Sequence, residues 1–302
     1  MALFTYDDTS RREDLLSILR DVSPISDNYL TTNLGTGSAT NTLHEWLVFN
    51  ISRPTSITFV GEGAEVTEPL HTQPSRSNNI TAIIRREVKV SGTEQAVSVG
   101  KPGNPMDFQK GVALRQLKAD MEFALLNGTR ASGASGTARG MTGINGVIST
   151  NLTARSSGTS MSTTELEDIV QNSWDAVGSE FVGKVLLCPM GIKRKITTFT
   201  TRVQVQANST DRIFNNISFY ESASGTIKVV PHKDVANGAG TTHVYLLNED
   251  MYRMAFLKGR EPKYEEKPST GDYDRGYYIT EMTLESLAER ASVKRYGYAQ
   301  NG

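Results

Sequence analysis

The residues most able to do chemistry are few in this chain and lie far apart. It has four histidines, His44, His71, His232 and His243, and a single cysteine, Cys188. Metal sites gather their ligands closely, so we expect each histidine to lie at a surface or an interface rather than to bind a metal. Cys188 ends an apolar run with no histidine nearby in the sequence, which predicts a buried, unreactive thiol.

Sequence motifs of catalysis are absent as well. The chain has no Gly-x-x-x-x-Gly-Lys-Ser/Thr phosphate loop, no Gly-x-Ser-x-Gly elbow, no His-Glu-x-x-His and no paired-cysteine zinc spacing. The glycine-rich stretch 128–146 carries Arg130 and Arg139 but follows no strand, so we interpret it as a hinge between two lobes. The acidic residues of 265–274 are interpreted as solvated. We therefore expect no catalytic residue, no cofactor and no metal.

Size and charge narrow the class further. The 302 residues could form one or two domains, and 32 Lys and Arg against 33 Asp and Glu give a net charge of −1. A duplex-DNA-binding domain would show a basic excess. The first residues lack the basic and apolar regions of a secretory signal, and no apolar run approaches the roughly 20 residues of a membrane span. We expect a soluble protein made in a reducing cytosol.

Residues 56–99 predict a long two-stranded ribbon. The returning half alternates apolar and polar side chains from 80 to 91, as a half-buried antiparallel strand does. The outgoing half carries Ile57 and Phe59, and the tip between the halves is rich in turn residues. A lone ribbon is marginally stable in water. We therefore expect it to lie on a neighbouring copy of the same chain, which predicts an assembly protein.

A long amphipathic helix follows the ribbon. It is predicted from about 107 to 127, ending at Gly128, with Lys118 and Glu122 facing solvent as an i,i+4 ion pair. By pattern alone the segment 277–296 fits a helix or a strand. The other predicted elements are helices at 11–22 and 163–178, a helix or turn at 192–199, and strands at 44–51, 184–189, 227–231 and 243–247.

Five short strings carry a resemblance to a known family. They are TLHEW at 42–46, EGAEVT at 62–67, VKVSGT at 88–93, LRQLKADME at 114–122 and ARGMTG at 138–143. The chain is predicted to run through an arm, a ribbon, a long helix, a glycine connector, an α/β lobe and a returning strand. In this order of elements, and in the order and spacing of the five strings, the chain resembles the major capsid (major head) proteins of tailed double-stranded DNA phages. The sequence of these strings is similar to that of the SU-type siphovirus branch of the family. The fold of the family is shared with encapsulins.

The resemblance implies an α+β chain with the tailed-phage major capsid protein fold. It implies an N-terminal arm (1–50), an extended β-hairpin loop (51–101), a peripheral domain with a long spine helix (102–150 and 251–302) and an axial α/β domain (151–250). It also implies a strand for most of the ambiguous C-terminal segment.

The implied function is structural rather than enzymatic: self-assembly into the icosahedral phage head, with localisation to the virion after assembly in the host cytoplasm. The implied partners are copies of the chain in pentamers and hexamers, with portal, scaffold and decoration proteins, and packaged double-stranded DNA contacted weakly on the inner face; no membrane is implied. Inter-subunit contacts are expected at Glu62, Glu65, Pro69, Leu70, His71, Arg85, Arg86 and Lys118.

Two alternatives stay open at this point. One is an encapsulin-like cargo compartment, which has the same fold. The other is a small-oligomer enzyme that uses carboxylates of the 151–250 lobe, and it would show a deep pocket with carboxylate pKa values shifted from their usual range.

Overall fold

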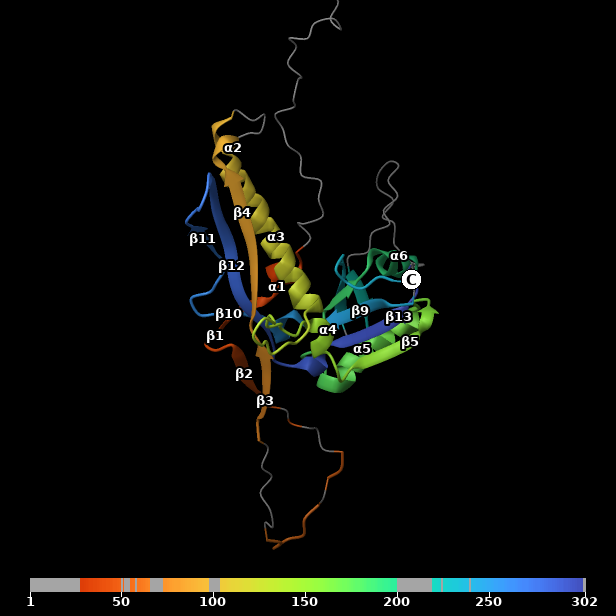
Figure 1. The fold of residues 1–302 in the computed structure, drawn as a ribbon. Coiled ribbons are helices and arrows are strands. Elements are labelled where there is room, and N and C mark those ends of the chain that lie inside the picture. The colour runs from red at the N-terminus through yellow and green to blue at the C-terminus, as the bar shows by residue number, and fades with distance from the viewer. Residues whose placement is uncertain are drawn as a thin grey trace, which may run out of the picture.

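The computed structural model describes residues 28–49, 51, 55–57, 59–65, 73–97, 104–199, 219–223, 225–238 and 240–300. These residues form an elongated lobe, a compact second lobe beside it and a thin limb that projects from their junction (Figure 1). The helix predicted at 11–22 and the tip of the ribbon lie outside the described residues.

The predicted long helix is confirmed as α3, Pro105–Asn127. Asn104 caps its start by accepting a hydrogen bond from the Met106 N–H at 2.9 Å, and Pro105 sits in the first turn, where a missing N–H costs nothing. Glu122 lies on the buried face of α3, so the expectation that it faces solvent and pairs with Lys118 is wrong.

The elongated lobe is a five-stranded sheet with α3 along one face (Figure 1). The central strand β12 pairs antiparallel with β4 on one side and with β11 and then β10 on the other, and β1 pairs parallel with β10. Val88 and Val90 of β4 pack on Met106 and Ala113 of α3. The strands are β1 (Gly35–Ala39), β4 (Ala82–Ser91), β10 (Tyr252–Leu257), β11 (Lys263–Lys267) and β12 (Tyr273–Ser286).

The compact lobe is a six-stranded mixed sheet, which confirms the helices and strands predicted between 163 and 247. Leu186 of this sheet packs on Leu166 and Ile192 of the two helices that cover one face, whereas Leu187, on the other face, joins the core around α3. The elements are β5 (Leu152–Thr159), α5 (Thr163–Val177), β6 (Val185–Cys188), α6 (Met190–Phe199), β7 (Phe219–Ser222), β8 (Gly225–Pro231), β9 (Thr242–Leu247) and β13 (Val293–Tyr298).

The expected hairpin over 56–99 is wrong in its pairing. Strand β3 (Ser75–Ile80) pairs antiparallel with β2 (Leu43–Val48), and β4 pairs with β12 along its whole length. The alternation of apolar and polar residues from 80 to 91 therefore arises because α3 of the same chain covers one side of this strand. We define the limb as the residues between β2 and β3; its described residues 55–57 and 59–65 project from the body of the chain (Figure 1).

The C-terminal segment is β-structured, and it forms two strands rather than one. β12 ends at Ser286, a 3-10 turn follows at Glu289–Ala291, and β13 then pairs with β5 and β9 of the compact lobe. One chain segment thus supplies an interior strand to each sheet. Short helices complete the fold at α1 (Leu30–Asn33), α2 (Gly92–Ala96), α4 (Ile144–Val147) and a 3-10 turn at Glu249–Met251.

The glycine connector folds back against the end of α3. The Gly143 N–H donates to the Gly128 carbonyl at 2.9 Å, and Ala131 and Gly140 form a β-bridge. A Cβ on Gly143 would lie 2.6 Å from the Gly128 nitrogen and 2.8 Å from the Ala124 oxygen. This close crossing of two backbones explains why glycine stands at position 143.

Candidate assembly surfaces

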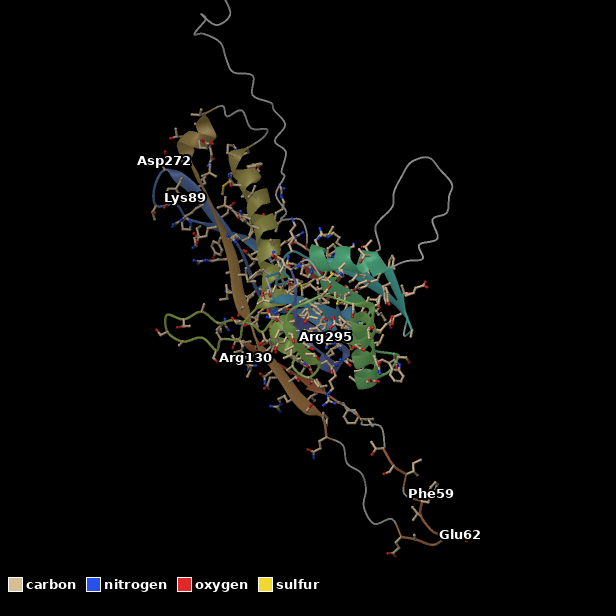
Figure 2. The ribbon with its side chains drawn as sticks, turned by 90° about the vertical axis from the view of Figure 1, so that its right-hand side faces the viewer. Phe59, Glu62, Lys89, Arg130, Asp272 and Arg295 are labelled. Atoms are coloured by element: carbon tan, nitrogen blue, oxygen red, sulfur yellow. The ribbon has the colours of Figure 1, made fainter. Side chains whose placement is uncertain are left out.

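The limb carries large apolar side chains that its own chain leaves uncovered. Phe59 is 91% exposed, and Ile57 and Val60 are each 74% exposed. Figure 2 shows Phe59 and Glu62 at the far end of the limb, away from both lobes. A run of uncovered Ile, Phe and Val is typical of a surface that meets another protein.

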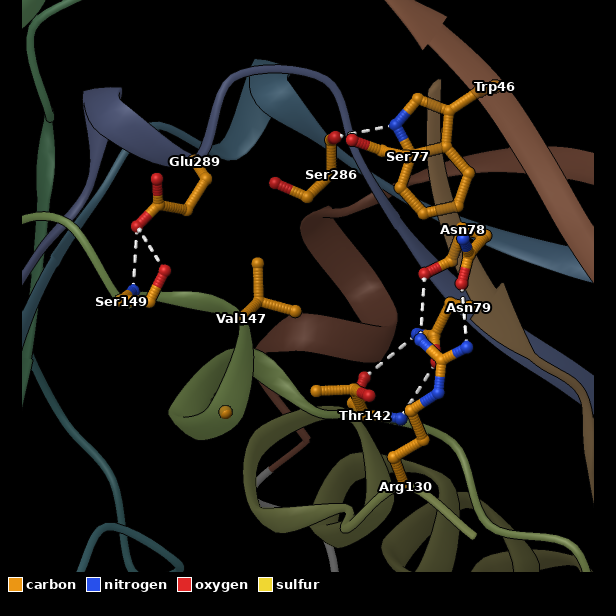
Figure 3. Close-up of a pocket in the computed structure, with 11 residues that line it drawn as sticks. Trp46, Ser77, Asn78, Asn79, Arg130, Thr142, Val147, Ser149, Ser286 and Glu289 are labelled. Atoms are coloured by element: carbon orange, nitrogen blue, oxygen red, sulfur yellow. Dashed lines mark hydrogen bonds between the residues drawn. The ribbon is translucent and has the colours of Figure 1, made fainter. Parts of the chain in front are cut away.

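The base of the limb is fixed to the body by side-chain hydrogen bonds (Figure 3). The Trp46 indole N–H of β2 donates to the Ser286 carbonyl at 2.8 Å. Asn79 of β3 donates to the carbonyls of Leu284 and Thr142 at 2.9 and 3.0 Å and accepts from the Thr142 N–H at 2.9 Å. The limb therefore leaves the molecule in a direction set by β12 and the glycine connector.

A pocket of about 460 Å³ opens between the limb base, the connector and the 3-10 turn after β12 (Figure 3). Arg130 donates to the carbonyl and side-chain oxygens of Asn78 at 3.3 and 2.6 Å, and Glu289 accepts from the Ser149 and Thr150 N–H groups at 2.6 Å. Its lining is mainly polar, unlike the apolar lining of most ligand pockets, and its charged groups already bind the protein. We interpret it as a joint between elements.

A buried carboxylate joins the connector to the first sheet. Glu281 of β12 is 2% exposed and lies 2.7 Å from an Arg139 nitrogen and 3.1 Å from the Arg260 Nε. The Thr81 hydroxyl, between β3 and β4, also donates to it at 2.7 Å. Two guanidinium groups and a hydroxyl compensate the burial of this charge, which is the condition under which a buried carboxylate is tolerated.

A second buried carboxylate joins three elements around α3. Glu122 Oε1 lies 2.8 Å from His232 Nε2, and both side chains are fully buried. The Asp234 N–H donates to His232 Nδ1 at 3.2 Å, which makes Nδ1 an acceptor and leaves Nε2 as the donor to Glu122. The Leu30 and Thr31 N–H groups of α1 donate to the two carboxylate oxygens at 2.6 and 2.8 Å.

These contacts set the acidity of Glu122. Burial alone would raise the pKa of this carboxyl, but the hydrogen bonds from His232 and from the two α1 N–H groups more than offset it, so the pKa lies below its usual range. Glu122 is therefore a charged anchor that holds α1, where the described chain begins, against the spine helix.

The structure places five of the eight predicted contact residues. Glu62 and Glu65 are exposed on the limb, Arg85 is exposed on the first sheet, and Lys118 is exposed on α3. Arg86 is also exposed, but it lies on the α3 side of β4 and forms an ion pair with Asp120 of the same chain. The structure does not bring these residues together into one patch. Pro69, Leu70 and His71 lie outside the described residues.

Sequence reasoning missed the buried carboxylate anchors, Glu122 and Glu281. Glu122 bonds to Leu30, Thr31 and His232, and Glu281 bonds to Thr81 and Arg139. Each of these partners lies 91 to 200 residues away in sequence from its carboxylate. The local signal that could have marked Glu122 is its position next to Met121 on the apolar stripe of α3.

The expectation of surface or interface histidines is wrong for His232, which is buried within its own chain. His44 lies 3.7 Å from Glu285, with its side chain 15% exposed. Burial lowers the pKa of His243 to about 4, with Lys294 adding to the shift. The predicted burial of Cys188 is confirmed, and this burial raises the pKa of its thiol to about 12.

Three carboxylates of the compact lobe serve as ion-pair or hydrogen-bond partners. Glu165 lies 3.1 Å and Asp168 lies 3.8 Å from Arg155, and Glu167 accepts from the Tyr220 and Ser222 hydroxyls. Within the described ranges, no three His, Cys, Asp or Glu side chains are grouped as they would be around a metal ion. Of the helices that the structure describes, none is long and apolar enough to cross a membrane.

The chain as a whole matches a known family. The match is to the family described as SU10 major capsid protein, and it extends over residues 3–298. The chain belongs to this family. No curated protein matches this capsid protein in sequence.

Solved structures show that this capsid protein has the expected fold. The capsid protein of a native GTA particle has a TM-score of 0.70 at 12% identity, with 98% of each chain covered. That of cyanophage A-1(L) scores 0.69 at 12% identity, covering 98% of this chain and 99% of that chain. The SrpI encapsulin of Synechococcus elongatus scores 0.61 at 11% identity, covering 97% of this chain and 94% of that chain. The predicted α+β fold of tailed-phage capsid proteins and encapsulins is confirmed.

Proposed function

We propose that this major capsid protein builds the icosahedral head of a tailed double-stranded DNA phage by docking its limb on a neighbouring copy. The observation that carries this proposal is the limb, where Phe59 is 91% exposed and lies away from both lobes (Figure 2). Within a family of capsid proteins, such a segment is best explained as a contact between subunits.

A tight-turn variant tests the role of the limb. Val48 and Ser75 are paired neighbours at the ends of β2 and β3, so replacing residues 49–74 with Asn-Gly would close these strands as a two-residue hairpin. We expect a folded subunit that forms no shells, measured by sedimentation and electron microscopy, with circular dichroism as the folding control. Shells at the wild-type yield would contradict the proposal.

The strand pairing supports a revised division of the chain. We propose an arm up to α1, a limb between β2 and β3, a peripheral domain of α3 with the first sheet, and an axial domain formed by the second sheet. In this division β4 moves from the loop to the peripheral domain, and β13 moves from the peripheral to the axial domain.

We further propose assembly through pentamers and hexamers, in which each copy is held by several neighbours. Because many simultaneous contacts add up, each can be modest. Packaged DNA would contact the inner face weakly, in keeping with a net charge of −1. Portal, scaffold and decoration proteins are the further partners that such a head would use, and co-purification with shells from infected cells tests them.

The encapsulin-like alternative is less well supported, because the matched family is one of capsid proteins. The nucleic acid content of purified particles separates the two, since a phage head packages double-stranded DNA. An enzymatic role is less well supported, because Glu165, Glu167 and Asp168 of the compact lobe are engaged with Arg155, Tyr220 and Ser222.

A further inference from the structure

Three asparagine–glycine pairs lie in the part of the chain that the structure describes, at Asn127, Asn145 and Asn237. An asparagine followed by glycine readily loses its side-chain amide without an enzyme, because glycine has no side chain to hinder the approach of its own nitrogen. By sequence alone the three pairs are equivalent. Any difference in their reactivity must therefore come from the fold.

Loss of the amide takes two steps and needs only water. The glycine backbone nitrogen gives up its proton and bonds to the asparagine Cγ, and the side-chain amide leaves as ammonia, which closes a succinimide ring. Water then opens the ring at one of its two carbonyls, giving either aspartate or isoaspartate. A reactive pair therefore needs an unbonded glycine N–H, an unbonded side-chain amide and contact with water.

The pair at Asn127 is held at both reacting groups. Asn127 is the last residue of α3, and the Gly128 N–H donates to the Ala124 carbonyl at 2.9 Å. The Asn127 Nδ2, which would leave as ammonia, donates to the Asp234 carbonyl at 2.8 Å. Attack would have to break both hydrogen bonds, so the fold protects this pair.

The pair at Asn145 is held in a similar way. The Gly146 N–H donates to the Gly143 carbonyl at 2.9 Å at the start of α4. The Asn145 Oδ1 accepts from the Tyr245 hydroxyl at 2.9 Å, and the Asn145 backbone carbonyl accepts from Lys294 Nζ at 3.0 Å. The nucleophile and the side chain that it would attack are thus both fixed by the fold.

The pair at Asn237 lacks these restraints. Asn237 is exposed in the loop between β8 and β9, and neither its Nδ2 nor the Gly238 N–H forms a hydrogen bond with the residues that the structure describes. The Thr242 hydroxyl lies 3.3 Å from the Asn237 Oδ1 and 3.1 Å from the Gly238 carbonyl oxygen. A hydroxyl has one proton to donate, so it cannot hold both oxygens at once.

The loop around this pair is nevertheless fixed at its ends. His232 Nε2 lies 2.8 Å from Glu122 Oε1, and the His243 N–H donates to the Ala236 carbonyl at 2.9 Å. These bonds keep the loop on the surface of the folded subunit. The pair is therefore open to water in the native state, without any unfolding.

We infer that Asn237 is a site of spontaneous deamidation, at which the folded subunit turns slowly into its aspartate and isoaspartate forms while Asn127 and Asn145 stay intact. Each conversion adds one carboxylate to the compact lobe, which takes the net charge of the chain from −1 to −2. Isoaspartate also lengthens the main chain between β8 and β9, because the backbone then runs through the former side chain. The age of the protein thus sets the charge and the length of this loop.

Ageing of the full-length folded protein at pH 8 tests the inference, because the glycine nitrogen must lose a proton to react. Peptide mass spectrometry follows the replacement of the amide by a carboxyl group at each pair. We expect conversion at Asn237 to be about tenfold or more faster than at Asn127 or Asn145, whose N–H groups must first break a hydrogen bond. In urea the three rates should converge. Equal rates in the folded protein, or a faster rate at either other pair, would overturn the inference.

Variants at the pair give an independent measurement by isoelectric focusing. N237Q should remove the acidic form that appears on ageing, because glutamine would have to close a larger ring, and N237D should migrate with the aged protein from the start. G238A should slow the change; its new Cβ would meet Thr241 Oγ1, a side-chain atom that can turn away. N145Q is the matched control and should age as the wild type does. An acidic form that appears in folded N237Q at the wild-type rate would contradict the inference.

Discussion

Glu122 and His232 lie 110 residues apart in sequence and 2.8 Å apart in the fold, with neither side chain reached by solvent. Together with the α1 N–H groups on the same carboxylate, this bond connects the spine helix, the compact lobe and the beginning of the described chain.

Removing the charge of Glu122 should destabilise the subunit at neutral pH. Because its folded pKa is depressed, the ionised carboxylate stabilises the fold above its ordinary pKa of about 4.3, and this contribution is lost as the pH falls through the depressed value. We expect E122Q to lower the free energy of unfolding by about 2 kcal/mol at pH 7. The difference from wild type should shrink near pH 3, measured by urea unfolding; a difference independent of pH would contradict this role.

Substituting Gly143 should disturb the crossing of the connector over α3. An alanine Cβ would meet the backbone of Gly128 and Ala124 at under 3 Å, and backbone atoms cannot move aside as a side chain can. We expect G143A to cost roughly 1–3 kcal/mol in thermal unfolding. G111A, an exposed position inside α3 with open space around its Cβ, should instead stabilise the helix by about 1 kcal/mol.

The Trp46 indole should control how firmly the limb base is held. W46F removes the donor to the Ser286 carbonyl while keeping an aromatic ring, and we expect a cost of about 1 kcal/mol, which corresponds to about fivefold faster amide hydrogen exchange in β2 and β3. Exchange in β9 serves as the internal control and should not change. Equal acceleration in β9 would mean that the whole fold had loosened.

Cys188 should be inert in the native state. With its pKa raised to about 12 by burial, we expect a thiol reagent at pH 8 to modify it about a thousandfold or more slowly than in urea, where the thiol regains its ordinary pKa. Fast modification of folded shells would show that β6 opens to solvent.

The long helix and most strands could be predicted because their signals are local. The stripe of α3 repeats within one or two turns, and Asn104 and Gly128 mark its ends. The burial of Glu122 could not be predicted in this way, because the residues that stabilise its charge come from α1 and from the loop after β8. Spacing along one helix indicates a favourable neighbour, Lys118, but not a better partner elsewhere.

The pairing of β4 shows a second limit. Alternation from 80 to 91 indicated a half-buried strand but not the identity of its neighbours, and the nearest strand in sequence was the natural candidate. In the fold that partner is β12, which begins at Tyr273, and the covering helix is α3. Ile57 and Phe59 were predicted to form the outgoing strand of the ribbon; in the structure both lie on the limb, and both side chains are exposed.

The position of β12 and β13 near the C-terminus has a consequence for synthesis on the ribosome. Both sheets lack an interior strand until translation reaches β12, which begins at Tyr273, and β13, which ends at Tyr298. The limb, which lies between β2 and β3, is therefore synthesised long before either lobe can complete its sheet.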